Sequence, residues 1–215
     1  MNLFINSRIH LIGSLIVLFS FVAGGISSAA SVNKQAKSSS ENQGSKSNQE
    51  NFMLTNHMGS KVSLFDYKGK VVILLFGYTH CPDICPTQLA DMQRLLEKMG
   101  DNADQVQVLF ITFDPERDTP KVLKEFLTFF HPSFVGLTGT QEEIASVAQQ
   151  YNVIYMKREV GSKAGYLIGH SSFVYLLDQQ GHLYKWYKQN LEDSNSTLDQ
   201  MAGDIQQLIM KGSRT

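Results

Sequence analysis

Cysteine is nearly absent from this chain: only Cys81 and Cys85 occur among its 215 residues. So few cysteines exclude a disulfide-stapled scaffold and a zinc site built from cysteines alone, although a reactive pair fits the count. An excess of positive charge is also absent, since 19 Lys and Arg residues stand against 20 Asp and Glu residues. We therefore expect no binding to nucleic acid, which needs a basic field. Hydrophobic residues, at 42%, are frequent enough to build a core, which excludes a fully disordered chain.

The first thirty residues have the layout of an export segment. Arg8 precedes an apolar run from Leu11 to Val22, and small residues follow, among them Ser28 and Ala30, which suit the cleavage site of a signal peptide. The stretch from Leu11 to Ile26 is only a little shorter than the ~20 residues that span a membrane, so an uncleaved membrane anchor is the alternative. Either way, this segment is expected to lie outside the globular domain and to direct the chain out of the cytoplasm.

Residues 31–50 form a polar segment between the export segment and the rest of the chain. Twelve of these twenty residues are Ser, Asn or Gln. Such a composition cannot bury enough apolar surface to offset the entropy lost on ordering, so we predict a flexible linker. If the export segment is an anchor, the linker would hold the domain away from the membrane. A disordered extension without a function is the alternative.

Residues 51–215 are expected to form one α/β domain. Two continuous apolar runs, Val71–Phe76 and Val106–Thr112, are typical of strands covered on both faces of a sheet. Strand–helix alternation followed by a hairpin and a last helix predicts a thioredoxin-like domain, with a mixed central sheet flanked by helices, plus an N-terminal β-hairpin. Further strands are expected at 52–54, 61–65, 134–137, 172–177 and 182–187, and helices from the cysteine segment to Gly100, from Pro120 to before His131, from Thr140 to about Tyr151, and from about Thr197 to Met210. The domain is expected to contain an inserted helix–strand unit, and no helix or strand is assigned within the inserted region 155–167.

The segment Gly77–Pro86 joins a buried strand to an amphipathic helix, at the strand end where open α/β sheets place their sites. Pro86 suits the first helical position and disfavours a helical conformation at Cys85, so both thiols are expected on the loop before the helix. The helix N-terminus favours thiolates there. Cys81 and Cys85 can therefore bind one metal ion or close a small disulfide ring. A purely stabilising disulfide is the alternative, although so short a loop yields little stabilisation.

Two soft thiolates favour copper(I) over zinc, because structural zinc takes four protein ligands and no histidines here have finger-like spacing. One imidazole would complete a three-coordinate copper site, and spacing alone does not decide which histidine supplies it. The candidates are His57, His80, His131, His170 and His182. His80 is adjacent to Cys81, but strand alternation lets it point away. In a thioredoxin-like fold the loop that contains His170 faces the cysteine loop, so we predict that His170 is the third ligand.

Four groups of residues together resemble a known family. They are the C-x-x-x-C segment Gly77–Pro86, the preceding Asp66–Lys70, the later Asp114–Pro120, and Gly169–Ser172 followed by Asp178 and Gly181. With these groups in this order, over about residues 52–211, the sequence is similar to the Sco/SenC family of copper-binding assembly factors for cytochrome c oxidase.

The resemblance implies a copper chaperone in which Cys81, Cys85 and His170 hold copper. Such a protein delivers copper to the binuclear copper site of a cytochrome c oxidase subunit, and other copper carriers are further partners. The implied location is the periplasm or the extracytoplasmic face of the inner membrane. The alternative is an enzyme, a thiol–disulfide oxidoreductase whose redox pair Cys81–Cys85 reduces the cysteines of the copper-accepting subunit. A peroxidase is a third hypothesis, because reactive cysteines occupy a similar position in peroxiredoxin-like folds.

Other residues give rise to narrower hypotheses. Asp114 is expected either to orient the site through a hydrogen bond or to cap the turn before the next helix. Met53, Met58 and Met156 could form a path of sulfur ligands for copper. Scattered methionines are more typical of core packing, and we predict that these three pack in the core.

Overall fold

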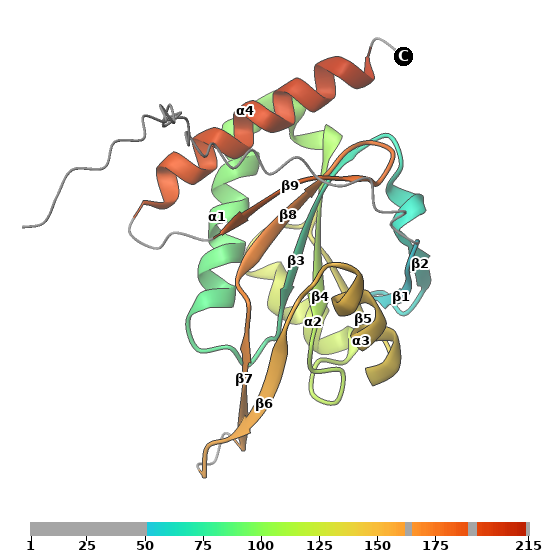
Figure 1. Cartoon of the computed structure of the whole chain (residues 1–215), viewed down its shortest axis with the longest axis vertical. Helices are drawn as coiled ribbons and strands as arrows, with labels where there is room; N and C mark the ends of the chain where they lie inside the picture. Colours follow the sequence, from blue (N-terminus) through green and yellow to red (C-terminus); the bar gives the residue numbers. More distant parts are fainter. Residues whose placement is uncertain (1–50, 162–164, 189–192, 214–215) are drawn as a thin grey trace, which may run out of the picture. The chain divides into compact units, whose positions relative to one another are not determined.

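A seven-stranded mixed sheet forms the centre of the structure, a computed structural model that describes residues 51–161, 165–188 and 193–213 (Figure 1). Its strands are β1 (Met53–Asn56), β2 (Lys61–Ser63), β3 (Val71–Gly77), β4 (Val106–Thr112), β5 (Val135–Thr138), β8 (Phe173–Leu177) and β9 (Leu183–Lys188). They lie in the order β2-β1-β5-β4-β3-β8-β9. The predicted export segment, 1–30, and the predicted linker, 31–50, lie outside the described residues.

The two longest apolar runs form the middle of this sheet. β3 and β4 pair in parallel from Val71 opposite Val106 to Gly77 opposite Thr112, and every residue of both strands is buried. Burial on both faces explains why these strands are continuously apolar rather than alternating. β5 extends the parallel part, while β8 pairs antiparallel with β3 and β9 with β8. The prediction of a mixed central sheet is therefore confirmed.

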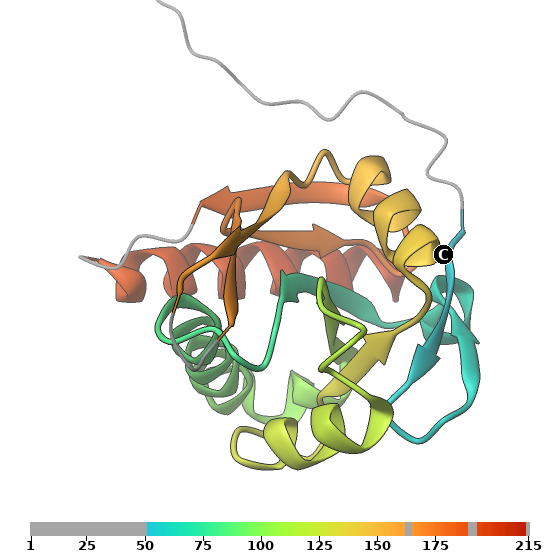
Figure 2. The same cartoon turned by 90° about the horizontal axis from the view of Figure 1, so that it is seen from below.

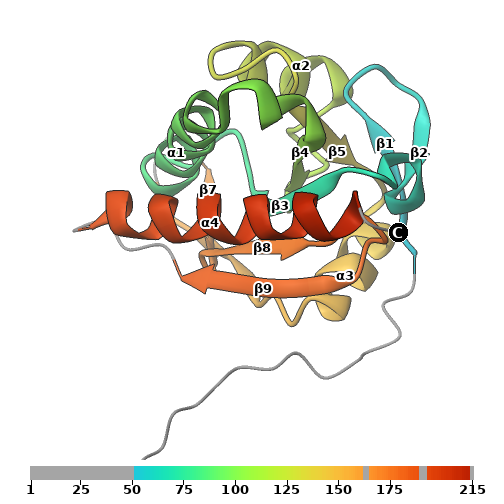
Figure 3. The ribbon, with the colours of Figure 1, turned by 90° about the horizontal axis from the view of Figure 1, so that it is seen from above.

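Helices cover both faces of the sheet. They are α1 (Ile84–Met99), α2 (Pro120–Thr128), α3 (Gln141–Gln150) and α4 (Ser194–Gly212). α1 packs beside α4, and Figures 2 and 3 show α3 on the face of the sheet opposite to α1 and α2. Leu89 of α1 and Ile205 of α4 are fully buried against the central strands, in a single hydrophobic core. This arrangement confirms the predicted thioredoxin-like α/β class.

The N-terminal hairpin is present, but its second strand is shorter than predicted. β1 and β2 pair antiparallel, and β1 also pairs with β5, so the hairpin forms one edge of the sheet. β2 ends at Ser63 instead of Phe65, because Leu64–Tyr67 form a 3-10 turn. A capping box closes that turn: the amide of Ser63 donates a hydrogen bond of 2.7 Å to the Asp66 carboxylate.

Two helices begin where the sequence predicts, and the last helix begins earlier than predicted. The hydroxyl of Thr119 accepts a hydrogen bond from the amide of Val122 at 3.4 Å, and Pro120 is the first residue of α2. Thr140 and Glu143 form a capping box at the start of α3, with hydrogen bonds of 3.1 and 2.8 Å. α4 begins at Ser194, before the predicted Thr197, because the Asp193 side chain caps it instead.

Residues 155–170 contain a second sheet, although no strand was predicted in this range. β6 (Tyr155–Glu159) and β7 (Tyr166–His170) pair antiparallel, and Figure 1 shows their hairpin projecting beyond the main sheet. The sequence of β6 is mostly polar, and four of its five residues are exposed, so it lacks the alternation by which a half-buried strand is recognised.

All described residues belong to one compact unit. No helix within the described ranges has both the length and the apolar character that crossing a membrane requires.

Candidate metal centre

The two cysteines lie where β3 passes into α1. Cys81 is half-buried on the connecting loop, whereas Cys85 is fully buried in the first turn of the helix. The prediction that both thiols precede the helix is therefore wrong for Cys85, and Pro86 is the third helical residue, not the first. The first-turn amides of a helix have no intrahelical acceptor, so a proline costs no hydrogen bond at that position.

A glycine at the end of β3 makes room for the buried sulfur. A Cβ atom on Gly77 would lie 2.8 Å from Sγ of Cys85 and 2.7 Å from Cε2 of Phe110. Real Cβ atoms do not approach other atoms so closely. The thiol of Cys85 therefore occupies a position that only a glycine at residue 77 leaves free.

The structure brings the three predicted ligand residues together. Sγ of Cys85 lies 3.6 Å from Nε2 of His170, and the amide of Cys85 donates a hydrogen bond of 3.5 Å to Sγ of Cys81. One ligand atom from each of the three residues lies within 4.8 Å of the other two. Both cysteines are free thiols, so no disulfide occupies the site.

The ring of His170 is held with Nε2 directed at the sulfurs. Its Nδ1 lies 3.1 Å from the carbonyl oxygen of Ser171, which can only accept a hydrogen bond, so Nδ1 carries the proton. In the neutral imidazole this leaves a lone pair on Nε2. The rings of Phe113 and Tyr78 lie 5.1 and 6.3 Å from the imidazole and limit its rotation. The prediction placed His170 in a loop before the next strand, but His170 is the last residue of β7.

The two thiols differ in acidity. A hydrogen bond from the Cys85 thiol, together with the amides of Asp83 and Cys85, lowers the pKa of Cys81 to about 4 even though burial opposes this shift. The same hydrogen bond, together with burial, raises the pKa of Cys85 above its ordinary value. At neutral pH the pair therefore consists of a Cys81 thiolate and a protonated Cys85.

The other candidate histidines do not join the cluster. Each contacts a different partner: His57 the amide of Gly136, His80 the Thr79 hydroxyl, His131 the Ser133 hydroxyl, and His182 the Asp178 carboxylate. Within the described part of the chain, the group Cys81, Cys85 and His170 is the one in which such donor atoms converge.

The cluster opens into a cleft of about 630 Å³, whose lining includes Cys81 and His170. Met156 and Arg158 of the projecting hairpin line the same cleft, as does Ile154 just before it. Met156 is 68% exposed, and Met53 and Met58 are exposed as well, so the prediction that these methionines fill the core is wrong. All three are carried by hairpins at the periphery, where no second layer covers them.

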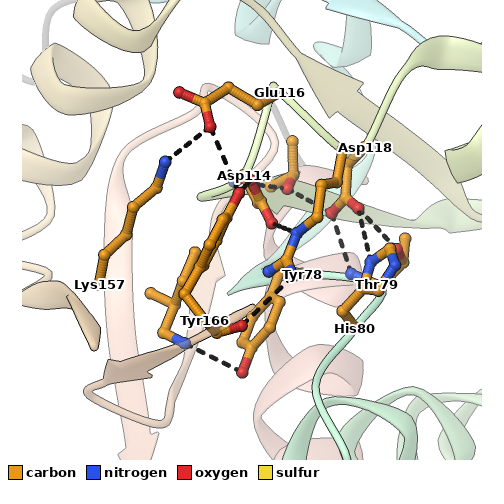
Figure 4. A network of polar contacts seen from close by, with 11 residues as sticks. Tyr78, Thr79, His80, Asp114, Glu116, Asp118, Lys157 and Tyr166 are labelled. Carbon is orange, nitrogen blue, oxygen red and sulfur yellow. Dashed lines mark hydrogen bonds and ion pairs between the residues drawn. The ribbon is translucent and has the colours of Figure 1, made fainter. Parts of the chain in front are cut away.

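Sequence reasoning missed one feature beside the site, a network of buried polar contacts in the segment 114–118 (Figure 4). The carboxylates of Asp114 and Asp118 are both fully buried. The backbone carbonyl of Asp114 accepts hydrogen bonds from the amides of Arg117 and Asp118, so this residue does form the turn before α2. Its side chain binds Arg117 and Tyr166 and reaches none of the three ligand residues directly. Two aspartates within six residues of the end of β4 were the available signal.

The sequence matches the SCO1/SenC family over residues 40–209. The chain belongs to the SCO1/SenC family. Over 165 residues it is 40% identical to protein SCO2, mitochondrial, of Saccharomyces cerevisiae, covering 76% of this chain and 54% of the yeast protein. The chain thus spans about half the length of that curated relative.

Solved structures of family members have the same fold. The crystal structure of Arabidopsis thaliana ScoI with copper bound is 40% identical and superposes with a TM-score of 0.68, over 74% of this chain and 98% of that one. BsSco, a member of the Sco family of cytochrome c oxidase assembly proteins in which a disulfide switch has been identified, is 30% identical with a TM-score of 0.61, over 75% and 92% of the two chains.

Proposed function

We propose that this domain binds one copper ion through Sγ of Cys81, Sγ of Cys85 and Nε2 of His170. The observation that carries the proposal is the convergence of these three atoms within 4.8 Å of one another. Two sulfurs and one imidazole suit a soft, three-coordinate copper(I) ion better than zinc, which prefers four ligands. The copper-bound structure of the Arabidopsis relative supports the same cargo.

The bound copper would be handed to a copper-accepting subunit of cytochrome c oxidase. The open cleft beside the cluster supports this role, because a partner's ligands can approach the ion from that side. The description of BsSco as a member of a family of oxidase assembly proteins supports the same class of partner. The ion itself would be supplied by another copper carrier.

The proposed location is the periplasm or the extracytoplasmic face of the inner membrane. Support comes from the export pattern of residues 1–30 and from the polar composition of 31–50, which suits a tether between that segment and the domain of 51–215. The export segment would act either as a cleaved signal peptide or as an anchor.

Copper(I) titration of the reduced protein tests the proposed site. We expect one copper per chain, and His170→Ala should weaken copper affinity by more than about 100-fold, because loss of an outer-shell partner alone costs about 10–100-fold. Cys81→Ser and Cys85→Ser should each weaken it at least as much. The matched control is His131→Ala, since the imidazole of His131 binds Ser133 and lies outside the cluster. Equal copper affinity for His170→Ala and His131→Ala would contradict the proposal.

A second function, thiol–disulfide exchange, is favoured by the unequal acidity of the two thiols. The Cys81 thiolate would attack a partner disulfide and release one partner thiol, and Cys85, after losing its proton, would displace the second. The partner would gain two electrons while Cys81 and Cys85 form a disulfide. His170→Ala distinguishes the two functions, because it should abolish tight copper binding and leave most of the reduction of a model disulfide.

A further inference from the structure

The two halves of the copper site lie on parts of the fold that share no strand pairing. The cysteines follow β3, a strand of the main sheet, on the loop and first turn of α1, whereas His170 ends β7 of the separate two-stranded sheet. The pairing of β6 with β7 fixes the shape of the hairpin but not its distance from the cysteines. His170 is three residues before Phe173, the first residue of β8, so the chain ties the base of the hairpin to the main sheet. Contacts to the hairpin then set how far the imidazole lies from the sulfurs, such as the hydrogen bond of 3.1 Å from the amide of Ile168 to the Tyr78 hydroxyl.

Asp118 binds the cysteine side of the site. Its buried carboxylate accepts hydrogen bonds from the Thr79 amide at 2.9 Å and from the Thr79 hydroxyl at 2.6 Å. It also accepts one of 2.6 Å from the hydroxyl of Thr112, at the end of β4. Thr79 lies two residues before Cys81, so Asp118 fastens the start of the cysteine loop to the neighbouring strand (Figure 4).

Asp114 binds the histidine side. Its buried carboxylate accepts a hydrogen bond of 2.6 Å from the Tyr166 hydroxyl and is paired with Nε of Arg117. The guanidinium of Arg117 lies 3.7 Å from the centre of the Tyr166 ring, and its Nη1 donates to the backbone carbonyl of Tyr166 at 3.3 Å. Tyr166 is the first residue of β7, and His170 is the last.

Burial and multiple partners stabilise these contacts. A buried carboxylate is costly unless it is paired and hydrogen-bonded, and both aspartates have several partners. The Tyr166 hydroxyl is protonated at neutral pH and donates to Asp114, and burial together with this hydrogen bond raises the pKa of Tyr166 to about 12. Lys157 of β6 adds an exposed ion pair of 2.9 Å with Glu116, from the same segment.

We propose that the segment Asp114–Asp118 is a brace that sets the distance between the cysteine sulfurs and the imidazole of His170. Asp118 holds the cysteine loop and Asp114 holds the hairpin, and a short, hydrogen-bonded turn connects the two. Tyr166 and Arg117 are then positioning residues for copper, acting through His170 without touching the ion. This inference rests on the proposed copper site.

A double-mutant cycle between Tyr166 and His170 tests the brace, with copper(I) affinity as the measurement. Tyr166→Phe removes the hydroxyl bound to Asp114 and keeps the ring beneath Arg117. In the chain that retains His170 we expect about a tenfold loss of affinity, within the range for outer-shell partners. In the His170→Ala chain the same change should alter affinity less than about twofold, because the imidazole it positions is gone. X-ray absorption should show the nitrogen ligand weakened or lost in Tyr166→Phe and both sulfur ligands kept.

Two further variants give this cycle its controls. Tyr184→Phe removes a hydroxyl that binds Gln207 of α4, so it should leave copper affinity unchanged in both backgrounds. Thr79→Val, on the cysteine side, should weaken binding with or without His170. Denaturant unfolding would establish that each variant is folded at the titration temperature, and Asp114→Asn would replace Tyr166→Phe if the latter is not.

The outcomes separate the brace from the copper site. An equal loss in both backgrounds, or no loss in either, would overturn the brace while leaving the three ligands in place. If His170→Ala itself had no effect on copper affinity, the copper site would fail, and the brace with it.

Discussion

Cys81 and Cys85 are chemically unequal because one of the two thiols must donate the hydrogen bond that they share. The donor, Cys85, is fully buried, where a charge would be costly, and the acceptor, Cys81, is half-exposed beside backbone amides. The more accessible sulfur is thus the thiolate. Such a sulfur is suited both to receiving a metal ion and to attacking a disulfide.

This inequality predicts the pH dependence of alkylation. At pH 6 iodoacetamide should modify Cys81 and spare Cys85, and the rate should fall only as pH drops through about 4. Because the unfolded chain still holds this proton up to its ordinary pKa of 9.0, the ionisation of Cys81 should make folding more favourable as pH rises from 4 toward 9. Mass spectrometry of the alkylated protein measures the first effect.

Cys85→Ala is the informative control for that experiment, because it removes the main cause of the low pKa of Cys81. Alkylation of Cys81 should then slow at pH 6 and require a higher pH. A rate that climbs only between pH 8 and 9 in the unmodified sequence would contradict the assignment.

Gly77 gives a second prediction for a single residue. In Gly77→Ala the new methyl group would meet Sγ of Cys85 and the Phe110 ring at under 3 Å, so the sulfur or the strand must move. We expect a loss of about 1–3 kcal/mol in unfolding free energy, as for other overpacked cores, and weaker copper binding. Gly203→Ala, at a helical position with open space around it, is the matched control and should not destabilise the fold.

At the scale of structural elements, each helix start depends on its own capping residue, so a single substitution can weaken one helix start. Thr140→Ala removes the hydroxyl that caps α3 and one half of its capping box. The expected cost is about 1 kcal/mol of unfolding free energy, measured by denaturant titration. Copper affinity should be unchanged, since Thr140 lies outside the cluster and its cleft. Weaker copper binding in this variant would mean that α3 contributes to the site.

The projecting hairpin is the element that the local sequence pattern did not predict. β6 and β7 pair over five residues each, yet half of these residues are exposed and no periodic apolar face marks the two strands. Their position depends on partners distant in sequence, such as the hydrogen bond of 3.1 Å from the amide of Ile168 to the Tyr78 hydroxyl. No window of the sequence around residue 160 contains that information.

At the scale of the whole molecule, copper binding should be coupled to folding. Cys85 and His170 are 85 residues apart, so the three proposed ligands converge only in the folded chain, while the unfolded chain keeps just the two cysteines as a local pair. Copper(I) should therefore stabilise the fold, by about 2.7 kcal/mol at a free concentration 100 times Kd. Thermal unfolding with and without copper measures this effect. The stabilisation by copper should be smaller in His170→Ala. An equal rise in the unfolding temperature of both proteins would show that His170 does not contribute to the preference of copper for the folded chain.

The sequence by itself determined the parts of this protein that depend on neighbouring residues. The apolar runs of β3 and β4, the caps of α2 and α3, and the C-x-x-x-C spacing on a strand-to-helix connection could all be read locally, because burial period, capping and short loops are properties of adjacent residues. The choice of His170 needed a fold to be assumed, since spacing left five histidines open.

Only the tertiary structure decided where distant residues meet. It brought Nε2 of His170 within 3.6 Å of Sγ of Cys85, joined Asp114 to Tyr166 across 52 residues, and left Met156 exposed at the cleft. Each of these results depends on how the hairpin packs against the main sheet. That packing follows from complementary shapes and buried charges of side chains far apart in sequence, which no local pattern encodes.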